Sequence, residues 1–149
     1  MIYRYSFDSA LCSGCGACAV ACMDLNDIDL KAGDAPFRTV SVTETPGKTP
    51  LLTFTSSACR HCEKPVCMEV CKYDCLIKDP ETGFISVDDF LCAGCLACVF
   101  SCPYGAVDTD RNGKASKCHG CSELIKRGLD PACVRACPTG ALKLEINDE

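Results

Sequence analysis

Hydrophobic and polar residues alternate over several short stretches of the chain, which is the pattern of half-buried β-strands. These stretches come in pairs, with a turn that contains glycine between the two members of each pair. Three β-hairpins are therefore predicted: Phe37–Thr45 with Pro50–Thr55, Leu76–Ile77 with Phe84–Val87, and Ala106–Asp108 with Ala115–Lys117. The predicted turns are Pro46–Thr49, Asp79–Gly83 and Asp110–Gly113, the last of which contains the strong hairpin signal Asn112-Gly113.

Helical patterns occur only in short pieces beside cysteines. The predicted helices are Ala17–Asp24, Lys64–Lys72, Leu96–Cys102, Ser122–Arg127 and Pro131–Ala136. No stretch reaches the eighteen or so consecutive apolar residues of a membrane span, so we expect no direct insertion into a membrane. With 149 residues and no low-complexity segment, the chain is expected to form one compact α+β unit.

Cysteine changes this picture of an ordinary small α+β protein. Seventeen residues are cysteines, and sixteen of them form four groups of four. Two groups have the spacing C-x2-C-x2-C-x3-C, which in bacterial ferredoxins places three thiolates on one [4Fe–4S] cluster and the fourth on its neighbour. Four such clusters are therefore expected. The groups are Cys12-Cys15-Cys18-Cys22, Cys59-Cys62-Cys67-Cys71, Cys92-Cys95-Cys98-Cys102 and Cys118-Cys121-Cys133-Cys137.

Disulfides and zinc are the other common uses of so much cysteine. The first residues contain no basic stretch followed by an apolar run, so a secretory signal is not expected and a reducing, cytoplasmic location is. Three cysteines at successive two-residue gaps crowd a tetrahedral zinc ion, whereas a cubane offers each thiolate a different iron. Proline follows the last cysteine at Cys102-Pro103 and Cys137-Pro138, as in ferredoxins.

The net charge of the chain restricts the classes of molecule that it is expected to bind. The formal net charge is −5. Four oxidised clusters with their thiolates would bring it to about −13. Such a negative protein is not expected to bind nucleic acid.

The ends of three cysteine groups form an internal repeat, C-P-x-G-A followed by an apolar residue. In this repeat a short helix ends, the chain turns at glycine and a strand begins. Asp74 stands in place of the glycine in the second group, and aspartate tolerates the left-handed conformation. Cys75 stands in place of the alanine, so we interpret it as a small buried residue, with a ligand or redox role as the alternative. The repeats are Cys71–Leu76, Cys102–Val107 and Cys137–Leu142.

The crossed ligation of two-cluster ferredoxins requires the four groups to form two pairs. The second and third groups are close in sequence, and pairing them leaves the first with the fourth. The sequence therefore predicts two nested ferredoxin-like modules, each with two [4Fe–4S] clusters. Residues 1–58 and 107–149 would form the outer module, with a β-hairpin insertion at about 37–55, and residues 59–106 the inner one.

At this point the chain resembles the iron–sulfur electron-transfer (beta) subunit of the DMSO reductase, or molybdopterin oxidoreductase, family. The C-x2-C-x4-C-x3-C spacing of the second group and the C-x2-C-x11-C-x3-C spacing of the fourth are more specific than ferredoxin spacing alone. Phe37-Arg38, which opens the first hairpin, also fits. The stretches that carry the resemblance are Leu11–Cys22, Cys59–Cys71, Leu91–Gly105 and Lys117–Leu142.

The resemblance implies a ligand set for each cluster. Cluster A would use Cys12, Cys15, Cys18 and Cys137; cluster B, Cys118, Cys121, Cys133 and Cys22; cluster C, Cys59, Cys62, Cys67 and Cys102; cluster D, Cys92, Cys95, Cys98 and Cys71. Some relatives replace a ligand at the start of the third group and hold a [3Fe–4S] cluster. All ligands are present here, so four cubanes are expected.

The implied function is non-catalytic electron transfer. The chain contains no catalytic constellation that we recognise, and a line of clusters would pass single electrons. One end would dock on a large molybdopterin subunit that holds molybdenum or tungsten. The other would reach a second redox partner: a flavoprotein, a ferredoxin, a hydrogenase or a membrane quinone subunit, with the chain in the cytoplasm or on the cytoplasmic face of a membrane complex.

Several alternatives remain open at this stage. The chain could instead be the small iron–sulfur subunit of a tungsten aldehyde oxidoreductase or of a hydrogenase-linked formate dehydrogenase, a free polyferredoxin, or a structural zinc protein. His61 and His119 lie inside C-x2-C loops, where they tune a cluster, gate proton uptake or are ordinary loop residues. Lys72 either raises the potential of a nearby cluster or is solvated. Lys114 and Lys117 face the clusters or a partner, or lie on a solvated strand face.

Overall fold

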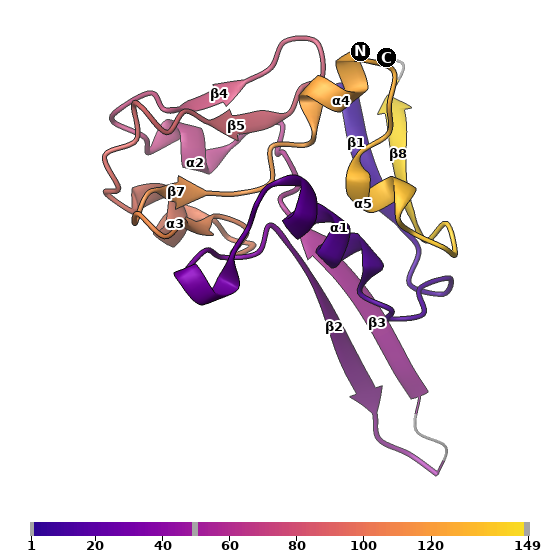
Figure 1. Cartoon of the computed structure of the whole chain (residues 1–149). Coiled ribbons are helices and arrows are strands. Elements are labelled where there is room, and N and C mark those ends of the chain that lie inside the picture. The colour runs from indigo at the N-terminus through magenta and orange to yellow at the C-terminus, as the bar shows by residue number, and fades with distance from the viewer. Residues whose placement is uncertain (1, 49–50, 148–149) are drawn as a thin grey trace.

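The computed structural model describes residues 2–48 and 51–147, and Figure 1 shows a body of short elements from which one long hairpin projects. The helices are α1 (Ala17–Leu25), α2 (Val66–Glu69), α3 (Ala97–Ser101), α4 (Ser122–Lys126), α5 (Ala132–Arg135) and the 3-10 helix η1 (Leu30–Ala32). The strands are β1 (Ile2–Phe7), β2 (Arg38–Thr45), β3 (Leu51–Ala58), β4 (Leu76–Lys78), β5 (Ile85–Val87), β6 (Asp108–Thr109), β7 (Ala115–Ser116) and β8 (Leu142–Asn147). Within the described residues, no helix is long and apolar enough to cross a membrane.

The described strands pair antiparallel in twos. The three hairpins predicted from the alternating pattern are confirmed as β2–β3, β4–β5 and β6–β7. A fourth pair, β1–β8, was not anticipated: it joins strands near the two ends of the chain in the register Phe7↔Leu142, and Figure 1 shows these two strands side by side. In the predicted first turn and second strand, Thr49 and Pro50 lie outside the described residues.

The 3-10 helix η1 was not predicted. The α-helices are those predicted, although most are shorter by a few residues. They pack in two pairs, α1 against α5 and α2 against α3. Each pair therefore brings together a helix from the two cysteine groups that crossed ligation would combine. The chain is a small mixed α/β protein with ferredoxin-like architecture. The nesting of two modules remains a prediction.

The internal repeat is visible in the backbone. Gly105 and Gly140 have φ of 57° and 68°, and Asp74, which stands at the equivalent position, has φ of 49°. The left-handed conformation predicted for Asp74 is therefore confirmed. Cys75 follows it with only 3% of its surface exposed, as expected for a residue in the place of alanine.

One hydrophobic core surrounds the β4–β5 hairpin. Cys75, Leu76 and Ile85 are buried there together with Val107 and Ala115. Val107 and Ala115 lie just beyond the predicted module boundary at residue 106, so the β6–β7 hairpin shares the core of the inner segment. A second buried contact lies on the other side of β5, where Phe84 stacks on Tyr5 of β1 with ring centroids 5.5 Å apart.

The β2–β3 hairpin is buried only at its base. Arg38 and Ser56 are 4% and 9% exposed, whereas Val42, Leu51 and Leu52 nearer the tip are all more than half exposed. Figure 1 shows the hairpin extending away from the helices. The base of the hairpin therefore belongs to the interior, and the tip is surface.

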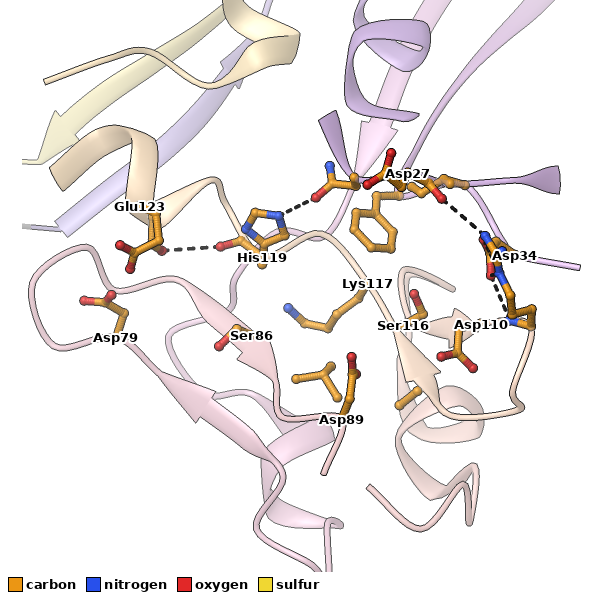
Figure 2. A pocket seen from close by; sticks show the side chains of 17 residues that line it. Asp27, Asp34, Asp79, Ser86, Asp89, Asp110, Ser116, Lys117, His119 and Glu123 are labelled. Carbon is orange, nitrogen blue, oxygen red and sulfur yellow. Dashed lines mark hydrogen bonds and ion pairs between the residues drawn. The ribbon is translucent and has the colours of Figure 1, made fainter. Parts of the chain in front are cut away.

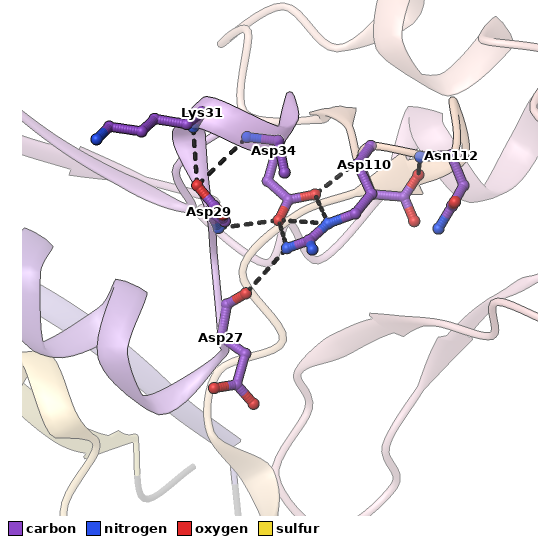
Figure 3. A network of polar contacts seen from close by, with 8 residues as sticks. Asp27, Asp29, Lys31, Asp34, Asp110 and Asn112 are labelled. Carbon is purple, nitrogen blue, oxygen red and sulfur yellow. Dashed lines mark hydrogen bonds and ion pairs between the residues drawn. The ribbon is translucent and has the colours of Figure 1, made fainter.

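A polar network ties the loop after α1 to the β6–β7 turn (Figure 3). The Asp34 carboxylate accepts from the backbone N–H of Arg111 at 2.8 Å and pairs with its guanidinium, which also donates to the Asp27 carbonyl at 3.3 Å. The hydrogen bond from the Arg111 side chain holds the pKa of Asp34 far below its usual range. The pair thus joins two segments 77 residues apart in the sequence.

Candidate metal centres

Four cysteines line one cavity at the ends of α1 and α5. Three of them come from the first cysteine group. The fourth, Cys137, lies with them although it is more than a hundred residues away in sequence. The surrounding apolar residues include Phe7, Val40 and Leu142. The four cysteines are Cys12, Cys15, Cys18 and Cys137, the set predicted for cluster A.

A second cavity gathers the predicted cluster D set. Cys71, from the end of the second group, lies with three cysteines of the third group, and the pKa of buried Cys98 is raised by desolvation and by the nearby charges of Cys71 and Cys92. Cys75 also lines this cavity. The predicted ligands that line it are Cys71, Cys92, Cys95 and Cys98.

Cys22 lies close to three cysteines of the fourth group, although it belongs to the first group in sequence. Burial raises the pKa of the Cys22 thiol to about 12, and three nearby cysteines add to this shift. All four are buried. The three neighbours are Cys118, Cys121 and Cys133, which complete the set predicted for cluster B.

The predicted cluster C set is brought together in part. Burial raises the pKa of Cys67, and Cys59 and Cys102 add to the shift, whereas Lys117 acts against it. These three cysteines therefore lie close together across two groups. Cys62, the fourth predicted ligand, is half-buried in the same loop as Cys59, three residues after it.

The first C-x2-C loop of each of the four cysteine groups has the same backbone conformation. The residue just before the second cysteine is left-handed in all four: Gly14, His61, Gly94 and Gly120 have φ between 49° and 74°. This turn aims backbone N–H groups at the first cysteine, because His61 N lies 3.4 Å from Cys59 Sγ and Gly120 N lies 3.4 Å from Cys118 Sγ. Such N–H groups stabilise a thiolate over a thiol.

The cysteine sets suit iron–sulfur clusters. All seventeen cysteines are free. A tetrahedral zinc ion with Zn–S of about 2.3 Å holds its sulfurs about 3.8 Å apart. Within the described residues, no three Cys, His, Asp or Glu side chains are close enough to hold one ion. A cubane spreads its thiolates over separate iron corners, so sets of four cysteines around an apolar cavity suit it.

Two histidines lie at the junction of the second and fourth groups. His61 Nδ1 accepts from the backbone N–H of Ile85 at 2.9 Å, and burial lowers the pKa of His61 to about 2, so it is neutral. Cys121 N–H donates to His119 Nδ1 at 3.2 Å, which leaves His119 Nε2 to donate to Asn26 Oδ1 at 2.6 Å. In both rings Nδ1 accepts a hydrogen bond, so the ring proton is on Nε2.

A separate cavity of about 470 Å³ contains no cysteine. Figure 2 shows carboxylates around it, among them Asp79, Asp89 and Asp110, with Lys117 between Ser86 and Ser116. Of the residues singled out from sequence, Lys72 is exposed and Lys117 is 3% exposed. The sequence alone does not indicate whether Lys117 is buried, because a lysine beside a strand carries no signal of burial.

Comparisons with known proteins support the binding of iron–sulfur clusters. The model of a family described as 4Fe-4S dicluster domain matches residues 51–147. The B subunit of the anaerobic dimethyl sulfoxide reductase of Escherichia coli (strain K12) is 34% identical, over 99% of this chain and 75% of that protein. The thiosulfate reductase electron transfer subunit of Salmonella typhi is 35% identical, over 99% and 77%.

The B subunit of the polysulfide reductase of Wolinella succinogenes is 38% identical, over 94% of this chain and 74% of that protein. These relatives extend along nearly the whole chain, so the likeness is not confined to the cysteine motifs. This protein therefore belongs to the iron–sulfur electron-transfer subunits, or beta subunits, of the DMSO reductase family of molybdopterin oxidoreductases.

Proposed function

We propose that this chain relays single electrons through four [4Fe–4S] clusters, between a catalytic molybdopterin subunit and a second redox partner. The observation that carries the proposal is the crossing of Cys22. It follows Cys18 in sequence by four residues, yet its electrostatic neighbours are cysteines of the fourth group. Only crossed ligation of the ferredoxin kind requires that separation.

The proposed ligand sets are those that the resemblance implies. They are Cys12, Cys15, Cys18 and Cys137 for cluster A; Cys118, Cys121, Cys133 and Cys22 for B; Cys59, Cys62, Cys67 and Cys102 for C; and Cys92, Cys95, Cys98 and Cys71 for D. Each cluster when bound supplies one-electron chemistry, and the protein supplies spacing, water exclusion and electrostatics. The sets divide between an outer and an inner module, with the β2–β3 hairpin inserted in the outer one.

The spatial relations support the series A, B, C, D. A and B share the α1–α5 helix pair, and C and D share the α2–α3 pair. The charge of Cys59 of set C acts on the thiol of Cys118 of set B, which supports a position of B next to C. Cys15 of set A and Cys95 of set D are exposed, so the two ends of the series reach the surface, where partners can exchange electrons.

A subunit of a complex is favoured over a freely diffusing polyferredoxin. Phe90, just before the third cysteine group, and Phe100, between its last two cysteines, are 99% and 84% exposed. Exposed aromatic side chains are costly on a carrier and useful at an interface. The second partner would be a flavoprotein, a ferredoxin, a hydrogenase or a membrane quinone subunit. We place the complex in the cytoplasm or on the cytoplasmic face of a membrane, because free thiols suit a reducing compartment.

Anaerobic copurification of the untagged native complex tests this function. We expect a large partner subunit with molybdenum or tungsten and a pterin in about equal amount with this chain. Tungsten together with an aldehyde oxidoreductase, or a hydrogenase-linked formate dehydrogenase, would favour the related small-subunit function. A protein that purifies alone with full iron content would instead be a polyferredoxin, and the proposal would be wrong.

A further inference from the structure

Two cations, Arg38 and Lys117, are buried in the interior. Arg38 is 4% exposed and Lys117 is 3% exposed. In the part of the chain that the structure describes, neither side chain is in an ion pair; the pairs are made by Arg4, Arg111 and Lys126. Burying an unpaired charge is costly, so a compensating negative charge is required nearby.

Lys117 lies between the second and fourth cysteine groups. Its ammonium donates to the backbone carbonyls of Ile85, on β5, and of Cys118, the latter at 2.7 Å. Its charge acts on the thiols of Cys67 and Cys118, which belong to the proposed sets C and B. Neutral carbonyls alone do not balance a full positive charge.

The carboxylates around the neighbouring cavity do not supply the missing charge. Asp34 is paired with Arg111, and Asp79 is paired with Lys126 at 2.6 Å. Asp110 accepts from backbone N–H groups of its own turn. Among the described residues, Lys117 lines this cavity without forming an ion pair to any of them (Figure 2).

Arg38 lies between the first and fourth groups. Its guanidinium donates to Ser56 Oγ at 2.9 Å, and Ser56 Oγ lies 3.4 Å from Cys18 Sγ of the proposed set A. Because Ser56 accepts from Arg38, its own hydroxyl proton is free to point to Cys18. The Arg38 charge also acts on Cys22 and Cys121 of set B.

We propose that Arg38 and Lys117 are fixed counter-charges at two junctions of the electron path, Arg38 between clusters A and B and Lys117 between B and C. This inference rests on the ligand sets of the proposed function. A cluster that gains one electron becomes one unit more negative, so a buried cation beside it favours the reduced state and raises its reduction potential. Placed between two clusters, the cation also reduces the repulsion between their charges.

The test is an EPR-monitored redox titration of the anaerobically purified, fully loaded protein. Lys117→Gln keeps a donor for the two carbonyls and removes the charge. We expect it to lower the potentials of the two components that Cys121→Ser and Cys67→Ser abolish. Arg38→Gln is expected to lower those that Cys15→Ser and Cys121→Ser abolish. The component abolished by Cys95→Ser should move in neither variant.

Lys114→Gln is the matched control. It removes one positive charge from the same hairpin, where the ammonium donates to the backbone carbonyl of Asp89. It should leave all potentials in place. Unchanged potentials in both Gln variants, or an equal shift of all four components, would overturn the proposal.

A variant that loses iron is also informative. If Lys117→Gln lost clusters while Lys117→Arg kept them with normal potentials, positive charge would be the requirement, as proposed. If both lost them, the requirement would be side-chain shape, and the proposal would be wrong. Wild-type protein with fewer than four clusters would instead refute the proposed function, so the two failures are distinguishable.

Discussion

The Sγ atoms of Cys71 and Cys75 lie 3.3 Å apart. Cys71 is a proposed ligand of cluster D, whereas Cys75 occupies the position of Ala106 and Ala141 in the internal repeat. Cys75 is buried in the core around β4–β5. Its thiol therefore touches a proposed ligand, and the internal repeat assigns Cys75 itself no ligand role.

Cys75→Ala should retain all iron and the full reduced EPR signal. Loss of one buried sulfur should destabilise the fold by about 1 kcal/mol. Cys71→Ala is the control and should lose one cluster. If Cys75→Ala lost a cluster instead, Cys75 would be a ligand and the second group would be out of register.

The C-x2-C loop of the fourth group depends on Gly120. A Cβ built on Gly120 would lie 2.1 Å from the Phe84 ring, and its φ is +74°. Gly120→Ala should therefore destabilise the protein by roughly 2–4 kcal/mol, the sum of backbone strain and overpacking.

Gly128→Ala is matched to this variant, because Gly128 has the same φ of +74° and nothing within 4 Å of the added Cβ. It should cost only about 1 kcal/mol, from backbone strain alone. Anaerobic denaturant unfolding measures both values. Equal destabilisation would mean that Phe84 moves aside and that the close contact is unimportant.

The Asp34–Arg111 pair predicts a pH dependence of stability. Hydrogen bonding to Arg111 lowers the pKa of Asp34 in the folded state. Stability from this pair is therefore present above the unfolded value of about 3.9 and is lost as pH falls through the lower folded value. Wild type should be more stable than Asp34→Asn at pH 7, and the difference should shrink below about pH 4.

The free energy of unfolding of both proteins across this range is the measurement. The comparison between two variants cancels the acid lability that their clusters share. A difference that stayed constant from pH 7 to about pH 3.5 would show that the carboxylate charge is not what joins the two segments.

The crossed ligand sets predict which variants share a phenotype. Cys137→Ser should perturb the same EPR component as Cys15→Ser. Cys22→Ser should perturb the component that Cys121→Ser affects. In a folded variant, a Cys22→Ser effect confined to the Cys15 component would mean that each group binds its own cluster, and the nested arrangement would be wrong.

Local signals in the sequence predicted much of the fold. The hairpins follow from alternation and turn glycines, and the left-handed Asp74 follows from the repeat, because both depend on residues within a few positions. The β1–β8 pair was missed because Ile2–Phe7 finds its partner at the opposite end of the chain, and one strand alone does not specify a distant register. The spacing of the proposed ligands could be recognised in the sequence for the same reason as the hairpins, because it depends on residues close together in the chain.

The burial of individual charged residues could not be predicted from the sequence. Arg38 opens a strand whose tip is exposed, and Lys117 follows a short hairpin whose turn is exposed, so neither stands out by pattern. The burial of Arg38 depends on how the first and fourth groups meet, and that of Lys117 on how the second and fourth meet. Both are tertiary relations. The same holds for the Asp34–Arg111 pair, whose members are 77 residues apart.

The most direct test of the central claim is the iron and acid-labile sulfide content of the anaerobically purified protein. Four complete sets of ligands predict about sixteen iron and about sixteen sulfide per polypeptide, in a brown protein with broad visible absorption. Iron near eight, or a substantial zinc content, would contradict the account of four clusters in series.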